Sequence, residues 1–151
     1  CPACQVYRPV IDSFIETEVL AGRARFEFRM FPTVDQDGIA FRVMECAAAD
    51  NPAAFFEYQS AMYEVTVNED TATGIISAFL EATGLDNEVL SGCVGTADQY
   101  ITDQALGREV GVSGTPAMYI RLADGSLVPA VPDARGAIPL EMLVGLVEQA
   151  Q

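Results

Sequence analysis

A block of helical periodicity in the middle of the chain constrains the fold more than any other sequence feature. Over residues 39–95 apolar side chains recur at spacings of three and four, and turn or capping residues divide the stretch into several helices. Patterns typical of strands occur only on either side of it. We therefore expect residues 38–95 to be an all-helical insertion in an α/β domain formed by residues 1–37 and 96–151.

The flanking segments supply the elements of that α/β domain. Helical spacing predicts a first helix over residues 2–21, and a proline inside it, Pro9, predicts a kink. Alternation predicts strands over residues 23–31, 117–121 and 127–130, the last two joined by a hairpin turn. A closing helix is expected over residues 136–150. The other expected helices cover residues 39–49, 70–84, 86–93 and 96–110, and one more helix is expected to begin at residues 51–52. A turn is expected at residues 35–38.

A Cys-Pro-Ala-Cys motif, residues 1–4, stands at the start of the first predicted helix. Unpaired N–H groups and the positive end of the helix dipole favour a thiolate there, and the thiolate is the nucleophile in disulfide exchange. Cys4, one turn after Cys1, can attack a mixed disulfide on Cys1 and release the partner. The spacing predicts a redox-active pair, with a structural disulfide or half of a zinc site as alternatives.

The chain has four cysteines and no histidine. An even count suits complete pairing in an oxidising compartment. A zinc site made from all four would use Cys46 and Cys93 as isolated ligands, whereas structural zinc sites use closely spaced pairs. The lack of histidine excludes Ser-His-Asp and Cys-His mechanisms and most zinc hydrolase sites. We expect neither a metal nor a cofactor.

Charge and hydropathy exclude several classes of partner. The formal net charge is −14, from 22 acidic and 8 basic residues, and the acidic residues are scattered. Such a surface repels nucleic acid and anionic lipid headgroups, so we expect no nucleic-acid partner. No apolar run approaches the length of a membrane span, and no signal peptide is visible. Because the chain starts on the first cysteine, we expect the natural protein to have an upstream segment, through which it could be anchored to a membrane.

Two motifs taken together resemble the thioredoxin superfamily. The Cys-Pro-Ala-Cys motif followed by Pro9 is similar to the redox helix of that family, and the Gly-Val-Ser-Gly-Thr-Pro segment at 111–116 resembles its cis-proline loop. The helical block between them is similar to the insertion of the DsbA-like branch. The resemblance implies a thioredoxin-like α/β fold, with its first strand missing, that carries an inserted all-helical subdomain.

The same resemblance implies roles for individual residues. Cys1 would be the exposed nucleophile and Cys4 the buried resolving thiol. Thr115 would offer its backbone to an extended substrate segment and would contact the Cys1 sulfur, with cis-Pro116 shaping the groove.

Similarity to DsbA-like proteins that have a second bridge in the helical domain implies a structural disulfide between Cys46 and Cys93. Its position in the predicted helical block agrees with that role. Two buried free thiols are the alternative.

The dipeptide between the cysteines of the motif sets the expected oxidising power. Pro2 restricts the backbone, and Ala3 stands where strongly oxidising relatives have a histidine that favours the thiolate. Ala3 can neither donate a side-chain hydrogen bond nor carry charge, so we expect a milder oxidant than those relatives, whose potential is about −120 mV. Both residues are also expected to contact substrate.

The leading functional expectation is a periplasmic or other extracytoplasmic thiol–disulfide oxidoreductase. It would give its disulfide to unfolded or partly folded exported proteins and be reoxidised by a membrane quinone-linked protein of the DsbB or VKOR type. A reductase or isomerase would use the same pair in the other direction. The alternatives from other classes are a kappa-type glutathione transferase-like enzyme, a non-catalytic binding domain with an inert bridge, and a lipoprotein acylated on Cys1.

Overall fold

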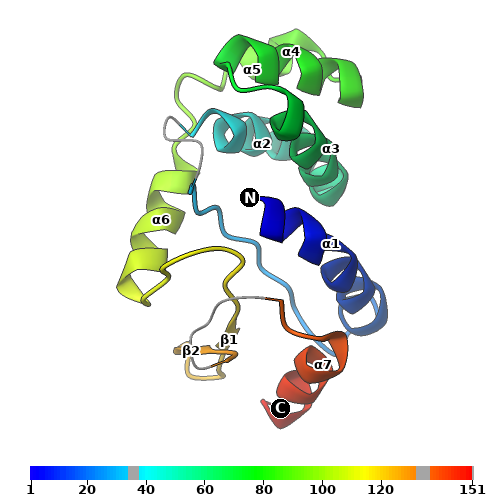
Figure 1. Cartoon of the computed structure of the whole chain (residues 1–151), viewed down its shortest axis with the longest axis vertical. Coiled ribbons are helices and arrows are strands. Elements are labelled where there is room, and N and C mark those ends of the chain that lie inside the picture. The colour runs from blue at the N-terminus through cyan, green and yellow to red at the C-terminus, as the bar shows by residue number, and fades with distance from the viewer. Residues whose placement is uncertain (34–37, 132–136, 151) are drawn as a thin grey trace. The chain divides into compact units, whose positions relative to one another are not determined.

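The structure is a computed structural model that describes residues 1–33, 38–131 and 137–150. The chain divides into two compact units, residues 1–29 with 106–151, and residues 30–105 (Figure 1). The second unit therefore extends beyond the 38–95 boundaries expected from the sequence, and the division falls inside helix α6 (Gln99–Glu109). Over the described part of the chain, none of the helices is both long and apolar enough to cross a bilayer.

The first unit begins with helix α1 (Pro2–Phe14), which continues into a π-helical turn, η1 (Ile15–Val19). Gly22, with φ of 73°, follows it, so the helical stretch ends close to the predicted residue 21. Pro9 lies inside α1, as expected. The prediction of this helix from its apolar spacing is confirmed.

The strand predicted over residues 23–31 is wrong. No residue of this segment belongs to a β-ladder, although its side chains alternate in burial as predicted, with residues 24, 26, 28 and 30 more enclosed than their neighbours. A strand needs the backbone of a partner, and no described segment of the chain pairs with this one. The alternation identified which side chains are enclosed but carried no information about a partner.

A short hairpin and a last helix complete the first unit. Strands β1 (Tyr119–Arg121) and β2 (Leu127–Pro129) pair antiparallel, with Ile120 opposite Val128. Both strands are shorter than expected. Helix α7 (Leu140–Gln149) starts later than the predicted residue 136, which lies outside the described residues.

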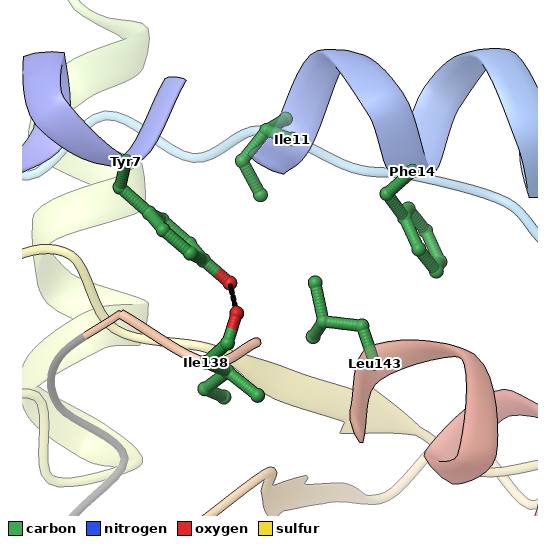
Figure 2. Packing of buried hydrophobic residues seen from close by; sticks show 5 residues of the cluster. All are labelled: Tyr7, Ile11, Phe14, Ile138 and Leu143. Atoms are coloured by element: carbon green, nitrogen blue, oxygen red, sulfur yellow. Dashed lines mark hydrogen bonds between the residues drawn. The ribbon is translucent and has the colours of Figure 1, made fainter. Parts of the chain in front are cut away.

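The core of the first unit joins α1 to α7 and to the segment just before it. Figure 2 shows its five buried side chains, which are Tyr7, Ile11 and Phe14 from α1 together with Ile138 and Leu143. Burial of a side chain of this size contributes about 1.5–3 kcal/mol. Met118 and Ala130, which flank the hairpin strands, pack against this cluster, so the cluster supports α1, α7 and the hairpin together.

The second unit is helical over its described residues, apart from its connecting segments. Its elements are α2 (Ile39–Asp50), the short 3₁₀ turn η2 (Pro52–Ala54), α3 (Phe55–Asn68), α4 (Ala72–Thr83), α5 (Asn87–Ser91) and the first part of α6. The predicted start and stop signals are confirmed. Thr71 caps α4, Gly84 ends it with φ of 69°, and Asp86 caps α5. Residues 35–37 of the predicted turn lie outside the described residues.

Three side chains of α2 bind the segment that leads from α5 into α6. Cys46 forms a disulfide with Cys93. The Arg42 guanidinium donates hydrogen bonds to the carbonyls of Val94 and Ala97, the second at 2.6 Å. A carboxylate oxygen of Glu45 accepts a hydrogen bond from the Gln99 N–H at 2.8 Å, at the first residue of α6. These contacts explain why the second unit reaches past residue 95.

Candidate redox site

Cys1 is the N-cap residue of α1. Its sulfur accepts a hydrogen bond from the Cys4 N–H, with an N–S distance of 3.2 Å. Pro2 occupies the first helical position, where its fixed φ suits the helix and its missing N–H costs nothing. The Cys1 sulfur therefore lies at the positive end of the helix dipole, where a negative charge is stabilised.

The Cys-Pro-Ala-Cys sequence brings its two sulfur atoms together across one helical turn. Cys1 and Cys4 are joined by a disulfide, and their Cα atoms lie 5.3 Å apart. Pro2 and Ala3 are exposed, whereas both cysteines are partly buried. We expected Cys1 to be exposed and Cys4 to be buried, but both residues have an intermediate degree of exposure.

The loop before β1 brings Thr115 to the same sulfur atom. The Thr115 hydroxyl donates a hydrogen bond to Cys1 Sγ at 3.1 Å, and the Thr115 carbonyl oxygen lies 3.5 Å from it. The peptide bond between Thr115 and Pro116 is cis. Two residues 114 positions apart in the sequence are thus in direct contact, and the Cys1 sulfur has one backbone and one side-chain donor.

Local hydrogen bonds hold this loop on both sides. Gly111, with φ of 85°, follows the end of α6, and the Val112 N–H donates to the Gly107 carbonyl at 2.7 Å. On the other side, the Tyr119 hydroxyl donates to the Val110 carbonyl at 2.8 Å. These bonds close residues 110–119 into a loop with Thr115 near its middle. Glycine is suited to position 111 because its φ lies in the left-handed region.

Tyr7, close to the redox pair on α1, makes a hydrogen bond that the sequence did not indicate. It lies on α1 one turn after Cys4, is buried, and donates from its hydroxyl to the Ile138 carbonyl at 2.8 Å (Figure 2). Burial raises the pKa of Tyr7 above its ordinary value, against a smaller opposing effect of this hydrogen bond. The phenol is therefore a neutral donor at physiological pH. Tyr7 is one of the apolar residues whose spacing predicts the first helix, but no sequence signal points to a carbonyl 131 residues away.

The second pair of cysteines lies in the second unit. Cys46 and Cys93 are bonded, with an S–S distance of 2.02 Å, and Cys46 is only 2% exposed. The four cysteines are thus divided between two disulfides. Within residues 1–33, 38–131 and 137–150, no three His, Cys, Asp or Glu side chains are grouped so that they could hold a metal ion.

Comparison with known proteins gives one family. A family model described as thioredoxin matches residues 1–126, a range that includes the Cys1–Cys4 motif, the second unit and the Thr115–Pro116 loop. Searches of curated proteins and of solved structures found no match. Because the family model covers most of the sequence, the chain belongs to the thioredoxin family.

Proposed function

We propose that this protein is a thiol–disulfide oxidoreductase of the DsbA-like type, which uses Cys1 and Cys4 to oxidise dithiols in exported proteins. One observation carries the proposal. The Cys1 sulfur lies at the N-terminus of α1, where it accepts hydrogen bonds from the Cys4 N–H and the Thr115 hydroxyl. These groups stabilise a thiolate, which is the form in which a cysteine attacks and leaves during disulfide exchange. Membership of the thioredoxin family also suggests a redox function.

The reaction transfers two electrons from a substrate dithiol to the Cys1–Cys4 disulfide. A substrate thiolate attacks Cys1 Sγ, the Cys1–Cys4 bond breaks, and the Cys4 sulfur leaves and takes up a proton. The second substrate thiolate then attacks the substrate sulfur of the mixed disulfide. A disulfide forms in the substrate, and Cys1 leaves as a thiolate. The Cys4 N–H and the Thr115 hydroxyl stabilise that leaving thiolate, and the protein finishes as a dithiol.

The residues around the disulfide suit an extended polypeptide as substrate. Pro2 and Ala3 are exposed beside the cysteines, so a substrate can approach Cys1 over them. Thr115 would pair its backbone with the substrate segment that contains the reacting cysteine, as in the addition of a strand, and Pro116 would shape the adjoining surface. The Pro2-Ala3 dipeptide has no side-chain donor, which supports a milder oxidant than relatives with histidine in the motif.

The assignment to the DsbA-like branch rests on the helical unit of residues 30–105, which we take to be an insertion in the thioredoxin fold. Two disulfides and no unpaired cysteine favour an oxidising, extracytoplasmic compartment, such as a periplasm. After each turnover the protein would need reoxidation, which we assign to a membrane quinone-linked protein of the DsbB or VKOR type.

Oxidative refolding of reduced ribonuclease A tests the proposal. The oxidised protein should accelerate recovery of ribonuclease activity, whereas Cys1→Ser and Cys4→Ser should not exceed the uncatalysed rate. A double variant, Cys46→Ala with Cys93→Ala, should retain the acceleration because it keeps the Cys1–Cys4 disulfide, and it serves as the control. Full activity in Cys1→Ser would contradict the proposal and favour a binding domain with an inert bridge.

Three further measurements separate the remaining alternatives. Reduction of insulin by the dithiol form, without oxidation of ribonuclease, would indicate a reductase. Conjugation of glutathione to an electrophile that survives in Cys4→Ser would indicate a kappa-type transferase. The intact mass of the natural protein would reveal acylation of Cys1, which would abolish the redox pair.

A further inference from the structure

We propose that Tyr7 is a positioning residue for the redox pair, because its hydroxyl fixes the first turns of α1 at the position where the Cys1 sulfur meets Thr115. The inference rests on the proposed function, since it concerns the same two cysteines. It assigns to a buried tyrosine a role beyond filling the core. The hydrogen bond from Tyr7 to Ile138 is the observation that carries it.

Pro9 weakens the connection between the first turns of α1 and the rest of the helix. A proline in a helix interior has no N–H to donate to the carbonyl four residues earlier, which here belongs to Gln5, and its ring crowds that carbonyl. Pro9 therefore separates the turns that carry Cys1 and Cys4 from the part of α1 that carries Ile11 and Phe14. Their position depends on whatever holds residues 2–8 directly.

Tyr7 holds that part of the helix. Of residues 2–8, all of which the structure describes, Tyr7 alone is buried, with 3% of its surface exposed. Its position three residues after Cys4 places both on the same face of α1. Apolar contacts in the core are non-directional, whereas the 2.8 Å hydrogen bond to the Ile138 carbonyl limits both rotation and sliding of the helix. Figure 2 shows the Tyr7 hydroxyl directed at this carbonyl, across the space between α1 and the segment before α7.

The same cluster also supports the loop that carries Thr115. Met118, three residues after Thr115, packs against the core cluster, and its carbonyl accepts a hydrogen bond from the Ala130 N–H at 2.9 Å. Ala130 packs against the cluster as well. The core thus fixes the Cys1 sulfur through Tyr7 and the Thr115 hydroxyl through Met118. The 3.1 Å contact between sulfur and hydroxyl depends on both attachments.

Tyr7→Phe tests this role, because it removes the hydroxyl and keeps the ring. The displaced Cys1 sulfur should lose the hydrogen bond from the Thr115 hydroxyl, which stabilises the thiolate more than the disulfide by about 1 kcal/mol. The redox equilibrium of Cys1–Cys4 with glutathione should therefore shift toward the protein disulfide by about fivefold. The pH at which the Cys1 thiolate forms, followed by its ultraviolet absorbance, should rise. Phe14→Leu, which disturbs the same cluster beyond Pro9, is the matched control. It should lower the thermal stability and leave the redox equilibrium unchanged.

A double-mutant cycle with Thr115→Val makes the test decisive. If Tyr7 acts by placing the sulfur against the Thr115 hydroxyl, Tyr7→Phe should produce little further shift in the Thr115→Val protein. The inference is overturned if Tyr7→Phe lowers stability and leaves the redox equilibrium where it was, or if the two effects add. Either result leaves the proposed function intact, because that function is tested by the dependence of ribonuclease refolding on Cys1 and Cys4, which neither result changes.

Discussion

At the scale of single residues, two donors to one sulfur atom define the site. The first, the Cys4 N–H, follows from local sequence, since any N-cap residue faces the third N–H of its helix. The second, the Thr115 hydroxyl, depends on a contact between residues 114 positions apart, which local reasoning alone would have described as a turn before a strand. Resemblance to a known family was needed to place Thr115 beside Cys1.

Removal of the Thr115 hydroxyl should make the protein a weaker oxidant. Hydrogen bonds to charged groups are worth about 1 kcal/mol more than those between neutral groups, so the hydroxyl stabilises the Cys1 thiolate more than the disulfide. Thr115→Val should therefore shift the equilibrium with glutathione toward the protein disulfide by about fivefold. The redox equilibrium measured in glutathione buffers gives this shift directly.

Thr115→Ser is the control for that substitution, because it keeps the hydroxyl and removes only a methyl group. Its redox equilibrium should stay close to that of the unmodified protein. An unchanged equilibrium in Thr115→Val would show that the 3.1 Å contact does not tune the sulfur.

At the scale of secondary-structure elements, helices could be predicted well because their signals are local. Thr71, Gly84 and Asp86 marked helix ends that the structure contains, since capping and left-handed φ depend only on neighbouring residues. The strand expected over residues 23–31 failed for the opposite reason. Its alternating burial was correct, but strand formation depends on a partner that no local pattern specifies.

The Cys46–Cys93 disulfide should stabilise the second unit without being needed for activity. It closes a loop with a sequence separation of 47, which in the chain-entropy model is worth about 4 kcal/mol. The double variant Cys46→Ala with Cys93→Ala should lower the free energy of unfolding by up to that amount, as measured by urea denaturation. The hydrogen bonds of Arg42 and Glu45 still hold the segment between α5 and α6 against α2, so the variant should fold.

Alkylation of the unreduced protein provides an independent check on that bridge. Blocking free thiols under denaturing conditions should modify neither Cys46 nor Cys93. Two modified cysteines at these positions would contradict the pairing, and an unchanged urea midpoint in the double variant would contradict its stabilising role.

At the scale of the whole molecule, the order of motifs was more informative than any one of them. A Cys-Pro-Ala-Cys helix, a helical block and a Thr-Pro loop indicated the thioredoxin superfamily, and a thioredoxin family model matches residues 1–126. The boundaries of the helical unit were less predictable. They depend on long-range contacts, such as the hydrogen bond of 2.9 Å from the Met30 N–H to the buried Asp103 carboxylate, which holds residue 30 and the first part of α6 in one unit.

The reduction potential of the Cys1–Cys4 pair tests the central claim most directly. The protein should exchange reversibly with glutathione, and its potential should be more negative than the value of about −120 mV typical of relatives with histidine in the motif, because Ala3 offers no side-chain donor to the thiolate. The measurement follows the fraction of Cys1–Cys4 disulfide across glutathione buffers by mass after alkylation. A pair that does not exchange with glutathione would contradict the redox role, and a potential as high as −120 mV would contradict the account of Ala3.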